Sequence, residues 1–202
     1  MSQASQVKSV QGTAQRGVTL VELMVVVAIV GIIGVIGMPS FARMLSSNTV
    51  TSQVNGFLID AQFSRSEALK RGTSVTMCRS ANPDAAAPTC VKSTDAGGWE
   101  TGWIIFVDGD NDGVRASGEQ LLRVQQSVAD SGGIQPVGGA YDVIRYRATG
   151  WAPGKATSLR FLPRAQSAQS DVTLGRTVCV NTLGRVKSMN TSDAVCVAGT
   201  GS

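Results

Sequence analysis

The densest cluster of side chains with metal-binding chemistry lies between Asp108 and Glu119. The stretch DGDNDGVRASGE has the spacing of an EF-hand calcium loop, in which acidic side chains supply oxygen ligands and a central glycine makes the sharp turn. The candidate calcium ligands are Asp108, Asp110, Asp112 and Glu119. The flanking stretches, WIIFV and LLRVQ, have β-strand character, whereas an EF-hand needs helices. We therefore favour a hairpin loop shaped by turn-forming residues and predict no cofactor, with a calcium site as the alternative.

The four cysteines fall into two local pairs. Cys78 and Cys90 enclose eleven residues, and Cys179 and Cys196 enclose sixteen. Of the three pairings that four cysteines allow, the local one is the most economical, and reduced buried thiols are the alternative. A zinc site is disfavoured because the chain has no His and neither pair has the close spacing of zinc ligands. Two disulfides would indicate an oxidising compartment.

The sequence offers no recognisable combination of catalytic residues. It contains no His, no Ser-Lys or reactive-cysteine motif and no Walker-type glycine loop. Its acidic residues cluster in one loop rather than as the separated pair that glycoside hydrolysis needs. We therefore expect a structural or binding subunit and not an enzyme.

A single carboxylate interrupts a long apolar run near the start of the chain. Val18 to Ile36 comprises nineteen residues, close to the ~20 that span a bilayer, and Glu22 is its only charged residue. A secretory signal peptide would have a shorter apolar region and a small-residue cleavage site. Because a carboxylate inside lipid costs about 2.5–3.5 kcal/mol on insertion scales, we expect one of two placements for Glu22. It lies near the membrane interface, or it meets a positive terminus when the helix packs against copies of itself.

The helix should continue beyond the apolar run to residue 71. Apolar residues recur at spacings of three, four and seven, as on one face of a core helix. They are Val50, Val54, Phe57, Ala61 and Ala68. Lys70 and Arg71 suit the carboxy terminus of a helix, and Gly72 supplies the stop.

After Gly72 the pattern changes to short β-like runs separated by Gly, Pro, Asn and Asp. The expected strands are 73–78, 102–108, 119–126, 141–147, 158–163 and 175–180. One long helix with an antiparallel sheet gives the α+β class. Charge is uneven: residues 18–140 carry 8 Lys and Arg against 11 Asp and Glu, whereas residues 141–202 carry 8 against 3. The cationic end points to an anionic partner.

The stretch GVTLVE, after a short leader with Lys8 and Arg16, resembles the type IV prepilin signature. The resemblance implies that a prepilin peptidase cleaves between Gly17 and Val18 and methylates the new amino terminus, although the family usually has Phe at the position of Val18. Glu22 would become the fifth mature residue. In the family this residue neutralises the amino terminus of a neighbouring subunit during filament assembly.

Three further stretches resemble the GspH/FimT group of minor pilins and pseudopilins: QFSRSEALKRGTSVTMC, WETGWIIFVD and CVNTLGRV. The resemblance implies a pilin lollipop, with a helix that is half membrane-spanning and half amphipathic on an antiparallel β-sheet head. The expected divisions are a cleaved leader at 1–17, a transmembrane and assembly helix at 18–47, and a periplasmic head at 48–202 that includes the amphipathic helix 48–71. The subunit would sit in the bacterial inner membrane and then join other pilins in a type IV pilus or a type II secretion pseudopilus.

The segment between Cys179 and Cys196 resembles the G-R-x-R element that FimT-type pilins use to bind DNA. Gly184 and Arg185 match the element, and Lys187 stands where its second Arg would be. The residues that would widen this basic patch are Arg176, Arg164 and Arg160. With few phosphate contacts, binding of double-stranded DNA in natural transformation would be weak. It would also be non-specific, because no recognition helix and no aromatic stacking platform is expected near residues 176–187. The alternative is a purely structural subunit that primes assembly of a pilus or pseudopilus.

Overall fold

The structure is a computed structural model that describes residues 17–92, 98–139, 141–154, 156–164 and 172–191. The chain divides into two compact units, Met1–Ala42 and Arg43–Ser202, so the second unit begins before the head that the sequence predicts from residue 48. Lys8 and Arg16 of the expected leader lie outside the described residues, as does Cys196.

Helix α1 spans Leu20–Arg71, as the sequence predicts. It begins after Thr19, whose Oγ1 accepts a hydrogen bond from the backbone N–H of Glu22 at 3.3 Å, the contact of a helix N-cap. It ends where Gly72 takes a φ of +66° and its N–H donates to the carbonyl of Ala68. This left-handed conformation costs glycine little, which explains why the helix stops there.

In the first unit the helix buries no residue between Leu20 and Ile33, although most of these side chains are large and apolar. By length and composition, no single described helix is apolar enough over a sufficient length to cross a membrane. The segments Leu20–Val35 and Ser40–Arg71 meet those criteria when they are taken together as a broken pair. The first unit thus leaves its apolar surface without a partner among the described residues.

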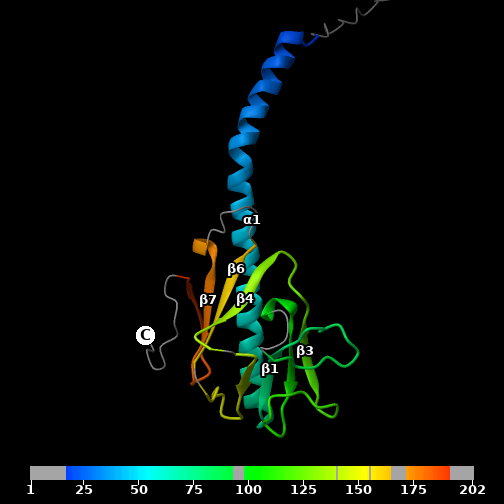
Figure 1. The fold of residues 1–202 in the computed structure, drawn as a ribbon, viewed down its shortest axis with the longest axis vertical. Coiled ribbons are helices and arrows are strands. Elements are labelled where there is room, and N and C mark those ends of the chain that lie inside the picture. Colours follow the sequence, from blue (N-terminus) through cyan, green and yellow to red (C-terminus); the bar gives the residue numbers. More distant parts are fainter. Residues whose placement is uncertain (1–16, 93–97, 140, 155, 165–171, 192–202) are drawn as a thin grey trace, which may run out of the picture. The chain divides into compact units, whose positions relative to one another are not determined.

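The second unit contains two four-stranded antiparallel sheets rather than the single sheet expected. The first sheet has the order β3-β2-β1-β5, with β1 at Val75–Arg79, β2 at Trp103–Val107, β3 at Leu121–Gln125 and β5 at Val143–Tyr146. The second has the order β4-β6-β7-β8, with β4 at Ser131–Val137, β6 at Thr157–Pro163, β7 at Arg176–Val180 and β8 at Val186–Asn190. Two 3₁₀ turns complete the described elements, η1 at Trp99–Thr101 and η2 at Val172–Leu174. Strands of both sheets lie against the carboxy-terminal part of α1 (Figure 1).

Phe57 of α1 stands at the centre of the core that the two sheets share with the helix. Its ring makes edge-to-face contacts with Trp99, Trp103 and Phe161, at centroid distances of 5.4–5.7 Å. Trp103 belongs to β2 and Phe161 to β6, so one helical side chain joins both sheets. All five residues of the predicted apolar stripe are buried in this core. The second unit therefore has a core of its own, built from residues that begin at Val50.

A smaller apolar cluster covers the other face of the first sheet. Cys78, Ile104 and Phe106 are fully buried there, and Cys90 packs against them from the segment that follows β1. Cys78 and Cys90 form a disulfide, which is the first of the two local pairs expected from the sequence. Cys179 is disulfide-bonded as well.

Candidate functional site

The acidic loop connects β2 to β3 and begins with a fully buried carboxylate. Asp108 Oδ2 accepts hydrogen bonds from Thr76 Oγ1 at 2.6 Å and from Arg145 Nε at 3.0 Å. Its backbone N–H donates to the carbonyl of Ser74 at 2.9 Å. Thr76 lies on β1 and Arg145 on β5, so Asp108 ties the end of β2 to two other strands of its sheet.

The next two aspartates shape the loop by binding its backbone. Asp110 Oδ1 accepts from the N–H of Asp112, and Asp112 Oδ1 accepts from the N–H of Val114 at 2.7 Å. Such local bonds are typical of Asp in turns. Asn111 and Gly113 have φ values of +64° and +80°, which suit these residue types. Asp110 and Asp112 are both exposed to solvent.

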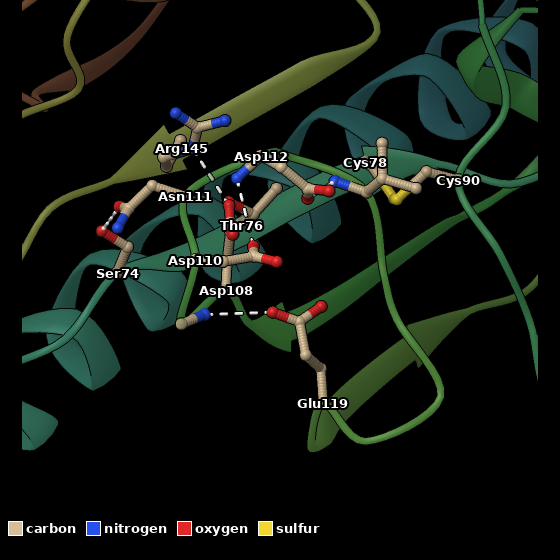
Figure 2. Close-up of polar contacts among 12 residues, drawn as sticks. Ser74, Thr76, Cys78, Cys90, Asp108, Asp110, Asn111, Asp112, Glu119 and Arg145 are labelled. Carbon is tan, nitrogen blue, oxygen red and sulfur yellow. Dashed lines mark hydrogen bonds and ion pairs between the residues drawn. A yellow bond between two sulfur atoms is a disulfide. The ribbon is translucent and has the colours of Figure 1, made fainter.

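One carboxylate oxygen from each of Asp108, Asp110 and Asp112 lies within 4.8 Å of the others (Figure 2). The fourth candidate ligand takes a different role, because both carboxylate oxygens of Glu119 bind the loop backbone. Oε1 accepts from the N–H of Gly109 at 3.0 Å and Oε2 from the N–H of Ala116 at 2.9 Å. The structure thus brings three of the four candidate ligands together and uses Glu119 to brace the loop.

The candidate DNA-binding residues Arg185 and Lys187 lie on the β7–β8 hairpin. The N–H of Gly184 donates to the carbonyl of Asn181, and the N–H of Asn181 donates to the carbonyl of Arg185. Gly184 has a φ of +75°, and a Cβ there would collide with the carbonyl oxygen of Gly150. Both the turn and the close packing therefore require glycine.

Arg185 and Lys187 are two residues apart and both exposed, so they point to the same face of the second sheet. That face is opposite the helical core, because Lys187 pairs with Cys179 while the neighbouring Val178 and Val180 are core residues. Among the described residues, no ion pair or hydrogen bond engages the guanidinium of Arg185.

A second turn lies beside this hairpin and brings an aromatic residue that the sequence did not place there. The N–H of Ala152 donates to the carbonyl of Thr182 at 3.1 Å, so Trp151 adjoins the β7–β8 turn. Trp151 is 58% exposed, whereas Trp99 and Trp103 are buried. An exposed aromatic residue therefore adjoins residues 176–187, a region for which the sequence predicted no aromatic stacking platform. No local sequence pattern predicts that Trp151 lies beside the β7–β8 turn, because its position depends on the hydrogen bond between the two turns.

Arg65 of α1 lies beneath both turns. A Cβ at Gly150 would stand 3.2 Å from Arg65 Nε, and one at Gly184 would stand 3.3 Å from it. The same guanidinium acts on Tyr146, where burial raises the pKa of the phenol and the charge of Arg65 opposes that change. Arg65 thus adds positive charge under the turns at this end of the head.

The three remaining candidate residues are spread over the second sheet. Arg176 pairs with Asn190 at the end of the hairpin far from Arg185, about 16 Å along the strand at ~3.3 Å per residue. Arg176 Nη1 donates to Asn190 Oδ1, and Arg164 forms an exposed ion pair with Asp130. Arg160 is half-buried on β6. Strand register therefore places Arg176 and Arg164 toward the end of the sheet far from Arg185.

Glu22, the predicted assembly residue, is exposed in the first turn of α1. No ion pair or side-chain hydrogen bond reaches its carboxylate within the part of the chain that the structure describes. Gly17 and Val18, the predicted cleavage positions, precede the helix and are exposed too. The acid is thus available to a partner outside the chain.

Two protein-family models match the sequence. The model described as type II transport protein GspH matches residues 53–184, and the model described as prokaryotic N-terminal methylation motif matches residues 12–38. No curated protein matches the chain.

Two crystal structures of the type IV minor pilin FimU from Pseudomonas aeruginosa are similar to this structure. The first has 19% identity and a TM-score of 0.51, and the match covers 72% of this chain and 91% of FimU. The second crystal form has 20% identity and a TM-score of 0.47, with 70% and 94% covered. The first match shows a shared α+β pilin fold. The chain belongs to the GspH family and also carries the N-terminal methylation motif, and together these matches make it a membrane-anchored minor pilin or pseudopilin, a class that associates with other pilins.

Proposed function

We propose that the head of this minor pilin binds DNA weakly and without sequence preference through the β7–β8 turn, as a step in natural transformation. The observation that carries the proposal is the exposed side chain of Arg185, which stands at a turn closed by two backbone hydrogen bonds and has no side-chain partner among the described residues. Lys187 lies on the same face and can contribute a second charge toward phosphates. Lys187 stands where the G-R-x-R element has its second arginine, and a lysine there keeps the positive charge that phosphate binding needs.

The surroundings of the turn support an anionic partner. Arg65 lies beneath it, and the adjacent Trp151 offers an exposed aromatic surface. Stacking of a base on an aromatic side chain contributes roughly 1–3 kcal/mol and is available only to unpaired bases. Trp151 therefore favours single-stranded over double-stranded DNA, which the sequence alone did not predict.

Binding is measured by fluorescence anisotropy of labelled DNA, with the full-length chain in nonionic detergent micelles. With two or three phosphate contacts we expect a Kd near the non-specific range of roughly 10⁻⁴–10⁻⁶ M and a log–log salt slope of about −2 to −3 for duplex DNA. Arg185→Gln with Lys187→Gln should abolish binding. Trp151→Ala should weaken binding to single strands more than to duplex.

The matched control removes two positive charges from the same sheet. Arg164→Gln with Arg176→Gln changes net charge equally but acts at sites far from the turn, so its affinity for DNA should stay near wild type. In cells, the Arg185/Lys187 variant should lower transformation and leave twitching motility intact. Equal binding by that variant and wild type would contradict the proposal and favour a purely structural subunit that primes assembly of a pilus or a type II secretion pseudopilus.

A further inference from the structure

We propose that the acidic loop binds one calcium ion through Asp108, Asp110 and Asp112. This site is independent of the DNA-binding turn and of filament assembly. The hairpin interpretation accounts for the backbone shape of the loop, because Asp110 and Asp112 each bind a nearby N–H and Gly113 supplies the left-handed turn. It does not account for two further features of the loop.

The first feature is the convergence of three carboxylates. Their nearest oxygens lie within 4.8 Å of one another (Figure 2), and like charges at such distances repel. Arg145 is bonded to Asp108, but the described residues place no ion-pair partner on Asp110 or Asp112. A divalent cation would balance the charge that Arg145 leaves uncompensated.

The second feature is an unsatisfied oxygen on the buried member of the group. Asp108 is 0% exposed, and its Oδ2 accepts both side-chain hydrogen bonds, from Thr76 and Arg145. Its Oδ1 is buried and has no hydrogen-bond partner among the described residues. Native proteins rarely leave a buried carboxylate oxygen unpaired, because the loss of hydration is costly. A cation held between Asp108, Asp110 and Asp112 would supply the missing partner.

The spacing and the ligand type favour calcium over other metals. Calcium binds oxygen at about 2.3–2.6 Å, so two oxygens on opposite sides of one ion lie up to roughly 5 Å apart. The observed limit of 4.8 Å is therefore compatible with three oxygens around one calcium ion. Magnesium needs oxygens at about 2.0–2.1 Å in near-ideal octahedral geometry, and zinc prefers His and Cys, neither of which belongs to the cluster.

An ion at this position would fasten the β2–β3 loop to the rest of its sheet. Asp108 already connects to β1 through Thr76 and to β5 through Arg145. Asp110 and Asp112 are exposed, so the ion would enter from solvent and keep water ligands. Such partly hydrated sites have affinities near those of extracellular calcium modules, about 10⁻⁴–10⁻³ M. Calcium at about 10⁻⁴–10⁻³ M would thus stabilise the folded head.

The test compares calcium binding by two matched double variants of the full-length chain in nonionic detergent micelles. Asp110→Asn with Asp112→Asn removes two ligand charges, yet each Asn oxygen can still accept the backbone bond that shapes the loop. Asp84→Asn with Asp130→Asn removes two exposed carboxylates elsewhere in the head. Isothermal titration calorimetry with calcium chloride gives stoichiometry and affinity, and thermal unfolding in EGTA, calcium or magnesium gives the stabilisation.

We expect wild type and the Asp84/Asp130 variant to bind one calcium ion and to melt at a higher temperature as calcium is added, because the ion binds the folded state. The Asp110/Asp112 variant should bind at least about tenfold more weakly, since two of three charged ligands are lost. Three outcomes would overturn the proposal. They are no heat and no thermal shift at about 5 mM calcium in wild type, an equal shift in the Asp110/Asp112 variant, and an equal effect of magnesium.

Discussion

The two halves of helix α1 contain similar apolar residues, but they differ in whether the rest of the chain buries those residues. From Leu20 to Ile33 every residue is exposed, whereas the stripe from Val50 to Ala68 is buried against two sheets. The second half finds its partner in its own chain. The first half does not, and an apolar surface of this kind marks contact with a membrane or with other helices. The comparison separates residues that hold the fold from residues that serve assembly.

The acidic residues of the helix show the same contrast. Glu22, in the first half, has no basic partner in the described part of the chain. Glu67, in the second half, is ion-paired with Lys70 and Arg71. A carboxylate that is paired internally supports the helix that carries it, whereas one left unpaired in an apolar run is available to a neighbouring subunit.

The largest expected effect is the loss of filament assembly in Glu22→Ala. The carboxylate is predicted to meet the amino terminus of a neighbouring subunit, so its removal should lower the amount of this pilin in sheared filaments. Membrane insertion should be unchanged or better, because the only charge of the apolar run is removed. Immunoblots of sheared filaments and membrane fractions measure both quantities.

Glu22→Gln serves as the control for side-chain size. It keeps the shape and loses the charge, so it should reproduce the assembly defect. Wild-type amounts of either variant in filaments would mean that the carboxylate has no role in assembly.

A pair of truncations in the helix sharpens the comparison of its halves. Phe57→Ala removes a fully buried ring that contacts both sheets and should lower the free energy of unfolding of the head by about 3–5 kcal/mol. Ile29→Ala removes a side chain that is 51% exposed and should change it by no more than about 0.5 kcal/mol. Chemical denaturation of both variants in micelles, followed by tryptophan fluorescence, gives these values. Similar losses of unfolding free energy in the two variants would contradict the conclusion that only the second half of the helix stabilises the head.

Helix and strand patterns predicted most of the fold because they depend on local periodicity. The helix bounds, the buried stripe and six of the strands follow from residue spacing and turn residues. Strands β4 and β8 are not among the six predicted strands. The glycines of β4 and its Pro136 are poor strand formers. Strand β4 forms at the edge of its sheet, where proline is tolerated, and a bulge between Ser131 and Ile134 accommodates the glycines.

The candidate sites were less predictable because they depend on contacts between distant segments. The calcium-loop pattern selected three aspartates whose carboxylates lie close together, but it could not show that Glu119 binds the loop backbone or that Asp108 Oδ1 lacks a partner among the described residues. Charge alone grouped Arg176 with Arg185, although strand register places them at opposite ends of a hairpin. Trp151 reaches that hairpin only through the pairing of Ala152 with Thr182.

The smallest expected effect is at Glu67, the internally paired acid. Its Oε2 accepts from Arg71 Nε at 2.6 Å, and this hydrogen bond holds the pKa of Glu67 below its ordinary value of 4.5. Because the folded-state pKa is depressed, the stabilisation is present above the unfolded-state pKa and is lost as the pH falls through the folded-state value. Glu67→Gln should therefore melt slightly below wild type at about pH 7, and the two curves should converge as the pH falls through the folded-state pKa of Glu67. Asp84→Asn, which removes an exposed acid without an ion pair among the described residues, should show no such pH-dependent gap. The test is the melting temperature of each protein, measured from neutral to acidic pH. If the difference between Glu67→Gln and wild type persists in acid, the ion pair with Arg71 is not the cause of that difference.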